Sequence, residues 1–203
     1  MEFDYIIVGA GSAGCVLASR LSEDPHIRVL LLEAGGRDRH PWIHMPLAMR
    51  WISRRPGVNW GYKTEPEPQC YGRQIPFPRG KVLGGTSSIN AMIYARGHPL
   101  DYDQWRQKGL KGWGYSDVLP FFRRSEGSWR DEDGFHGTSG PLKTSPPRID
   151  SPLYDLFSEA GEKLGFNRID DYNGAVSEGV AEPDFTISGG RRASTARSFL
   201  RPA

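Results

Sequence analysis

Residues 4–34 constrain the fold of this chain more than any other segment. Two short apolar runs, Tyr5–Val8 and Val29–Leu32, flank the glycine-rich turn Gly9–Gly14 and a stretch with apolar residues at helical spacing. Apolar runs without polar alternation are typical of strands that are buried on both faces of a parallel sheet. The segment therefore predicts a strand, a glycine turn, a helix and a second parallel strand, which is the βαβ unit of dinucleotide sites.

Each glycine of the turn has a separate physical role in such a unit. Gly9 permits the tight turn, Gly11 lets backbone approach a pyrophosphate, and Gly14 lets the helix pack closely on the strand. The N–H groups and dipole of the helix N-terminus then face the phosphates. Glu33 lies 19 residues after Gly14, where its carboxylate can accept hydrogen bonds from ribose hydroxyls and disfavours the phosphate of NADP. The unit alone leaves FAD and NAD open.

Composition excludes several classes of protein. The 203 residues carry 26 Lys and Arg against 24 Asp and Glu with no basic block, so nothing indicates nucleic-acid binding. The two cysteines, Cys15 and Cys70, and the five scattered histidines have no metal-binding or disulfide spacing, and we expect no metal. No apolar run reaches membrane-spanning length, and the acidic N-terminus enters a strand directly, unlike a signal peptide. We expect a cytoplasmic protein, with peripheral attachment to the inner membrane left open.

Residues 35–77 are rich in proline and aromatic residues, which excludes long helices. So many aromatic side chains must pack against something, because their exposure would forfeit much apolar burial. We favour an arm that wraps over the main sheet; the alternative is an edge of a substrate or flavin cavity.

The rest of the chain divides into helical segments and turns. Residues 99–127 predict two helices, residues 127–150 a polar border, and Ser151–Leu164 a helix that stops at Gly165. Gly189–Arg192 is expected to form a basic turn before a helix that starts at Ser194.

A second motif, at residues 78–97, has the composition of an anion-binding loop. Arg79 and Lys81 supply positive charge, Gly84 and Gly85 allow backbone amides to converge, and Thr86, Ser87, Ser88 and Asn90 add hydrogen-bond donors. The flanking residues are apolar, which anchors the loop in a core and disfavours a flexible linker.

With these two motifs the chain resembles the glucose-methanol-choline (GMC) family of flavoprotein oxidoreductases, over essentially its whole length. The matching pieces are Gly9–Gly14 with Glu33-Ala34-Gly35, Asn59-Trp60, Arg79–Asn90, Tyr94–Gly97, Gly112–Tyr115 and Gly190–Arg197. The closest resemblance is to bacterial choline and aliphatic alcohol dehydrogenases. The resemblance implies an α/β fold (α+β overall) in which a Rossmann-like FAD-binding domain precedes the beginning of a substrate-binding domain, incomplete in this chain. The FAD-binding domain is expected over 1–150, the start of the substrate domain over 151–190, and a return towards the FAD domain over 191–203.

The resemblance implies FAD as the cofactor. The implied flavin-binding residues are Gly9, Gly11, Ser12, Ala13, Gly14, Glu33, Ala34, Trp60, Arg79, Gly80, Val82, Leu83, Gly84, Gly85, Ser87, Asn90, Ala91, Met92 and Ile93. Some members attach FAD covalently through a histidine directly before the motif asparagine. That position is Ile89 here, so the flavin is expected to be non-covalent, and Ala91 replaces a serine found in those members.

The implied activity is oxidation of a primary alcohol to an aldehyde by hydride transfer to the flavin N5, with oxygen or a respiratory quinone as electron acceptor. The family's catalytic histidine lies far downstream, so we expect no catalytic base in this chain. We expect the chain to be the N-terminal part of a longer enzyme or to need a complementary C-terminal chain, since two parallel strands make no stable sheet alone. A non-catalytic flavin-binding module and an NAD-dependent dehydrogenase are the alternatives; residues 79–90 argue against the latter.

Overall fold

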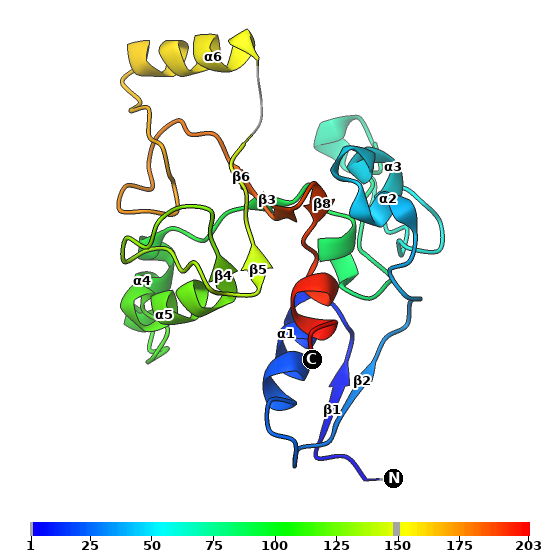
Figure 1. Cartoon of the computed structure of the whole chain (residues 1–203). Helices are drawn as coiled ribbons and strands as arrows, with labels where there is room; N and C mark the ends of the chain where they lie inside the picture. Colours follow the sequence, from blue (N-terminus) through cyan, green and yellow to red (C-terminus); the bar gives the residue numbers. More distant parts are fainter. Residues whose placement is uncertain (1, 148–150) are drawn as a thin grey trace. The chain divides into compact units, whose positions relative to one another are not determined.

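A computed structural model describes residues 2–147 and 151–203, and the chain forms two compact units (Figure 1). Unit 1 comprises Met1–Met92 and Ile187–Ala203, and unit 2 comprises Ile93–Thr186. These units differ from the FAD-binding and substrate-binding domains expected from the sequence, whose borders near residues 150 and 190 stay a prediction.

Unit 1 contains the predicted βαβ motif. Strand β1 (Tyr5–Val8) leads into helix α1 (Ser12–Leu21), and β2 (Val29–Leu32) returns parallel to β1. The register pairs Tyr5 with Val29 and Val8 with Leu32. The predicted strand bounds are confirmed residue by residue, and the predicted helix begins at Ser12, within the glycine-rich turn.

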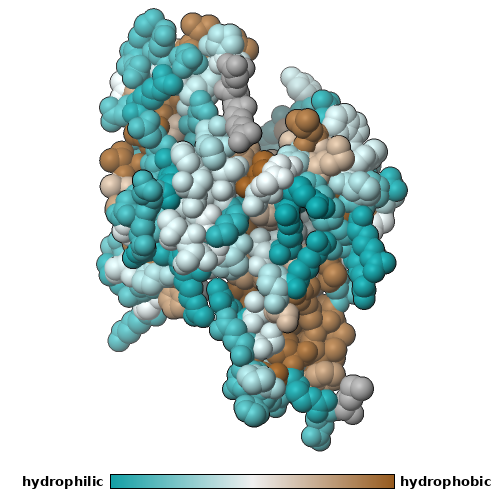
Figure 2. All heavy atoms as spheres, in the orientation of Figure 1, coloured by the Kyte–Doolittle hydropathy of each residue, from teal (hydrophilic) through white to brown (hydrophobic). Residues whose placement is uncertain are grey.

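The burial expected for both faces of this sheet is not found. Ile6 is 61 % and Val8 82 % exposed, and Figure 2 shows hydrophobic atoms gathered over β1 and β2. In the part of the chain that the structure describes, β1 and β2 form a sheet of two strands on which α1 packs. One helix can cover only one face of this sheet. Apolar side chains on the other face, such as those of Ile6 and Val8, therefore stay exposed.

The arm at residues 35–77 is irregular, as predicted, but it does not bury its aromatic residues. Its helical turns are α2 (Pro41–His44), η1 (Pro46–Ala48), α3 (Met49–Ile52) and η2 (Pro68–Cys70). The core is aliphatic instead: Ile43 and Ile52 pack with Val82 and Ile89. Burial of each such side chain contributes roughly 1.5–3 kcal/mol. The arm is therefore anchored by isoleucines, while Trp51, Trp60 and Tyr62 stay exposed.

The end of the chain returns to unit 1 as a hairpin and a short helix. Strands β7 (Ile187–Ser188) and β8 (Arg191–Arg192) pair antiparallel through Gly189 and Gly190, whose φ angles of 57° and 71° favour glycine. The π-helix η4 (Ala196–Leu200) then packs against α1. The predicted basic turn is thus a two-residue hairpin loop.

The described residues of unit 2 form helices α4, α5 and α6 and two pairs of very short strands. The helices α4 (Pro99–Gln107) and α5 (Tyr115–Ser125) match the predicted pair, and α6 (Pro152–Lys163) ends before Gly165, which has a φ of 91°. The strand pairs are β3 (Ile93–Tyr94) with β6 (Asp184–Phe185), antiparallel, and β4 (Glu126–Gly127) with β5 (Leu142–Lys143), parallel.

Candidate functional site

A cavity of about 890 Å³ opens in unit 1 at the ends of β1 and β2. Its lining combines the glycine turn, the strand ends, the arm and the second motif: Val8, Gly9, Gly11, Ser12, Leu32, Glu33, Ala34, Trp60, Tyr62, Arg79, Gly80, Gly85 and Thr86. Cavities of this size are typical of small-molecule and cofactor sites.

The two glycine motifs, about 70 residues apart in sequence, contact each other in this cavity. The Gly84 N–H donates to the Ala10 carbonyl over 2.7 Å. A Cβ at Gly85, which has a φ of 52°, would lie 2.7 Å from the Cα of Gly11. Only glycine permits this approach, so the close contact explains both the conformation and the residue type.

The N-terminus of α1 is available to an anion. No side chain caps it, and no acidic residue lies in its first turn. Gly11, the N-cap residue, lines the cavity, and a Cβ built on it meets nothing within 4 Å. The first N–H groups of a helix have no partner within it and its dipole is positive there, so this end of α1 suits a phosphate group.

Glu33 fixes the glycine turn from the end of β2. Its carboxylate oxygens accept hydrogen bonds from the backbone N–H groups of Ala10 and Gly35, each over 2.8 Å. Each oxygen keeps further lone-pair capacity, because a carboxylate can accept about four hydrogen bonds. Glu33 can thus hold the turn and still accept hydrogen bonds from a ribose.

The arm supplies an aromatic wall. Trp60 and Tyr62 stack with ring centroids 5.9 Å apart, and the Lys81 ammonium lies 4.6 Å from the Trp60 ring centroid. Asn59 connects this wall to the second motif, because its side-chain oxygen accepts from the N–H groups of Gly61 and Arg79, each over 3.0 Å. The cavity edge that we ranked second for the arm is therefore correct for Trp60 and Tyr62.

Some of the predicted site residues line the cavity and others do not. Those that line it are Gly9, Gly11, Ser12, Glu33, Ala34, Trp60, Arg79, Gly80 and Gly85. Outside the lining are Ala13, Gly14, Val82, Leu83, Gly84, Ser87, Asn90, Ala91, Met92 and Ile93. Gly14 and Val82 have packing roles: a Cβ at Gly14 would lie 1.9 Å from the Gly9 carbonyl oxygen, and Val82 is in the core.

The flavin-binding set implied by the resemblance left out four lining residues: Val8, Leu32, Tyr62 and Thr86. Val8 and Leu32 are the last residues of their strands, where a βαβ site lies, so their position was a usable signal. Thr86 stands inside the second motif, where its hydroxyl accepts from the Gly80 N–H. Tyr62 belongs to the aromatic arm, for which a cavity edge was the alternative interpretation.

The described residues place no histidine in the cavity lining. His40 and His98 accept hydrogen bonds at the N-termini of α2 and α4, and His44 contacts the Asp38 carbonyl. The cavity therefore offers binding groups and no imidazole base.

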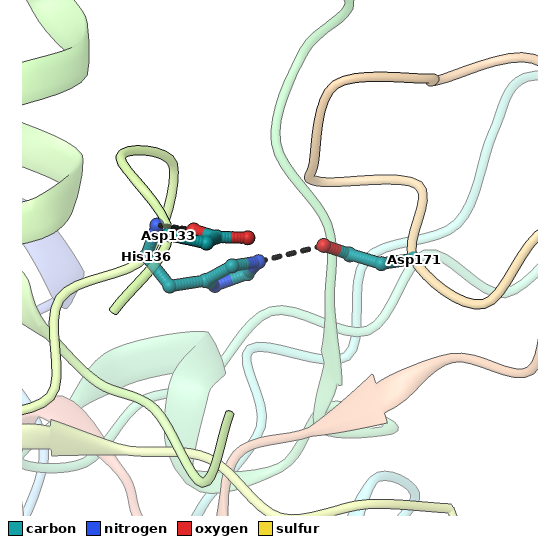
Figure 3. Close-up of side chains that lie close together, drawn as sticks. All are labelled: Asp133, His136 and Asp171. Carbon is teal, nitrogen blue, oxygen red and sulfur yellow. Dashed lines mark hydrogen bonds and ion pairs between the residues drawn. The ribbon is translucent and has the colours of Figure 1, made fainter. Parts of the chain in front are cut away.

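His136, in unit 2, belongs to a buried ion network. Its Nδ1 lies 3.0 Å from both Glu126 carboxylate oxygens and its Nε2 lies 2.7 Å from Asp171, while Arg96 pairs with Glu126 over 2.7 Å. Figure 3 shows the Asp171 carboxylate facing the His136 ring. Burial by itself lowers the pKa of His136, but the hydrogen bonds to Asp171 and Glu126 raise it to about 9.

The spacing of this network would also suit a metal ion, because ligand atoms of Asp133, His136 and Asp171 lie within 4.8 Å of one another. The donor set argues against that role. Both ring nitrogens of His136 face carboxylates and so carry protons, and Asp133 accepts from the backbone N–H groups of Phe135 and His136. A metal would have to displace a stabilised proton, so the geometry favours an ion network that joins three loops.

Comparisons with known proteins agree with the cavity. The GMC oxidoreductase family model matches residues 3–203, and the chain belongs to this family of FAD-dependent oxidoreductases. It is 51 % identical over its full length to the oxygen-dependent choline dehydrogenase of Sinorhizobium fredii, of which it covers 37 %.

Solved structures give the same result. Pyridoxine 4-oxidase from Mesorbium loti superposes with a TM-score of 0.92 at 41 % identity, over 98 % of this chain and 39 % of that one. An FAD-dependent oxidoreductase from Chaetomium thermophilum gives a TM-score of 0.89 at 30 % identity, over 100 % and 37 %. The chain thus corresponds to the N-terminal FAD-binding region of the family and spans under two-fifths of the length of these relatives.

Two glycine substitutions should separate packing from binding. Gly14→Ala should lower the free energy of unfolding by about 2–4 kcal/mol, because its Cβ would overlap the Gly9 carbonyl. Gly11→Ala should change it by less than about 1 kcal/mol, because its φ of −76° suits any residue and the Cβ meets open space. Gly11→Ala should nevertheless weaken FAD binding at least ~10-fold, since the methyl group enters the cavity.

Urea unfolding and flavin fluorescence titration measure the two effects. Gly36→Ala is the control, because a Cβ there also meets nothing within 4 Å. Equal losses of stability for Gly11→Ala and Gly14→Ala would contradict the assignment of separate roles.

The His136 network should make stability depend on pH. Because the folded pKa of about 9 lies above the ordinary 6.5, the contribution is complete below about pH 6.5 and is lost as pH rises through 9. The shift corresponds to roughly 3 kcal/mol.

Urea unfolding at pH 6 and pH 10 should show this loss in the native chain and not in His136→Gln. His26→Gln, at an exposed position, should behave like the native chain; parallel pH profiles for His136→Gln and the native chain would contradict the network's role.

Proposed function

We propose that this chain is the FAD-binding part of an enzyme that oxidises a primary alcohol to an aldehyde. The observation that carries the proposal is the junction of the two glycine motifs beside an uncapped helix N-terminus in one cavity. FAD supplies the electron-accepting chemistry when it is bound. The nineteen residues named from the resemblance remain the proposed binding set, and we assign direct contact with the flavin nucleotide to those that line the cavity.

The chain's own groups fit a dinucleotide. The N–H groups at the start of α1 suit a pyrophosphate, and Glu33 suits ribose hydroxyls. The Gly84 and Gly85 N–H groups already donate to the Ala10 and Val82 carbonyls, so these two glycines shape the loop. Trp60 and Tyr62 offer π faces to a planar ring.

We propose that the flavin is held without a covalent bond. Ile89 occupies the position before Asn90 at which some family members carry the linking histidine, and it is 1 % exposed within the aliphatic core. An alkyl side chain in that place has no nucleophilic atom.

The substrate is proposed as a primary alcohol and the electron acceptor as oxygen or a quinone. Two relatives, a choline dehydrogenase and a pyridoxine 4-oxidase, support this class. A choline cation would need aromatic or acidic surroundings. A second cavity, of about 580 Å³, lies beside Trp42 and Trp51, but Arg50, Arg54 and Arg55 also line it, and these charges disfavour a quaternary ammonium there.

We infer that further residues complete the site, either from a longer chain or from a complementary one. The exposed strands β1 and β2, the absence of histidine from the described cavity lining, and the greater length of the relatives support this inference. A non-catalytic flavin-binding module is the second candidate, favoured by the same lack of an imidazole base.

We propose a cytoplasmic setting for this protein. In the described ranges, no helix combines the length and apolarity needed to cross a membrane. Cytoplasmic placement, with contact to a membrane surface where a quinone is the acceptor, remains our expectation.

FAD binding by the purified chain tests the proposal. The chain mixed with FAD should retain 450 nm absorbance through desalting, and acid precipitation should release all of the flavin if it is non-covalent. Glu33→Gln should weaken FAD binding about 10-fold, or about 1.4 kcal/mol, because one charge-assisted acceptor is lost. Glu65→Gln, at an exposed position, is the matched control.

Addition of a primary alcohol without oxygen separates the two candidates. Bleaching of the bound flavin identifies the enzyme, and binding without bleaching identifies the module or a part that needs its complement. A chain that retains no flavin contradicts the proposed function.

A further inference from the structure

Arg192 is a buried arginine without a carboxylate partner. Its side chain is 1 % exposed, and among the described residues it forms no ion pair. Its neighbour Arg191 is exposed, as expected where successive side chains of a strand point to opposite sides. A charge at such a position is costly unless its surroundings compensate it.

The guanidinium group is compensated by oxygen atoms of two other segments. Its Nε donates to the Ile43 carbonyl over 2.8 Å. Its Nη1 donates to the carbonyl and the side-chain oxygen of Asn90, each over 2.8 Å, and to the Ser87 carbonyl over 3.2 Å. Arginine thus connects α2 with the end of the second glycine motif through its rigid fork of donors.

This contact lies where the loop is strained. Met92 has a φ of 65°, which is unfavourable for a residue with a side chain. The Asn90 side-chain oxygen accepts from the Met92 N–H over 3.1 Å as well as from Arg192. Arg192 therefore fixes the Asn90 side chain, which in turn stabilises the backbone turn at Met92.

The segment after Arg192 supports the same loop. The Thr195 N–H donates to the Ser87 hydroxyl over 3.0 Å, and that hydroxyl donates to the Gly84 carbonyl over 2.6 Å. Residues 192–195 thus contact the glycine motif from outside the cavity lining.

One donor of Arg192 remains unused. Its Nη2 is buried and has no hydrogen-bond partner among the described residues. Burial lowers the pKa of Arg192 to about 10, which leaves it charged at neutral pH. The loop therefore has a positive charge behind it that no carboxylate of the described chain neutralises.

We propose that Arg192 is a positioning residue of the flavin site: it fixes the Ser87–Met92 loop and gives it positive potential that the anionic FAD compensates. The proposal rests on the proposed function for its second half only. The first half concerns the loop without any ligand.

Hydrogen exchange of the ligand-free chain tests the first half. Arg192→Gln and Arg192→Lys should both speed exchange of the Met92 and Asn90 amides at least ~10-fold, because neither side chain reproduces the fork. Arg191→Gln should leave these amides unchanged. Unchanged protection in both Arg192 variants would overturn the proposal. Where the Arg192 variants do not fold by circular dichroism, Asn90→Ala, which removes the shared acceptor, should speed exchange at Met92, and its failure to do so would overturn the proposal.

FAD titration tests the second half. Arg192→Lys, which keeps the charge, should bind FAD at least ~10-fold more tightly than Arg192→Gln at equal loop exchange, and Arg191→Gln should bind like the native chain. Equal Kd values for the Lys and Gln variants would show that the charge of Arg192 does not contribute to FAD binding, and would overturn the second half of the proposal. A native chain that does not bind FAD contradicts the proposed function and the charge role together, while the exchange result still decides the role of Arg192 in the loop.

Discussion

The contact between the two glycine turns is the constraint on which the rest of unit 1 depends. The Gly84 N–H reaches the Ala10 carbonyl, and Gly85 approaches Gly11 so closely that no side chain fits between them. This contact requires the second motif to lie across the end of the βαβ unit. The Glu33 carboxylate stabilises the first glycine turn. The isoleucine core and the β7–β8 hairpin stabilise the second motif.

Local patterns predicted the elements well, because their determinants lie within a few residues. Both strands of the βαβ unit, the helices α4, α5 and α6 and the stop at Gly165 follow from periodicity and glycine placement. The family resemblance and the fold class are confirmed. Only some of the residues named from the motifs line the cavity. A motif contains residues that contact a ligand and also residues that pack within the protein.

Long-range features could not be predicted in the same way. Arg192 meets Ile43 across 149 positions, and His136 meets Asp171 across 35, so no local pattern records either contact. Burial failed as a prediction at Ile6 and Val8 for a related reason. The apolar character of a residue shows that its burial would be favourable. Whether it is buried depends on which other elements of the whole fold cover it.

The parallel pairing of β1 and β2 limits how this sheet can grow. A strand that joins an antiparallel edge can arrive through a hairpin of two residues, but a parallel neighbour requires a crossover of a dozen residues or more. Such crossovers are right-handed in nearly all proteins, which also decides the side of the sheet on which the connecting segment must pass. Among the described residues, the outer edges of β1 and β2 pair with no further strand. A later part of the same chain can therefore add a parallel neighbour only by way of a segment long enough to cover one of the sheet's faces.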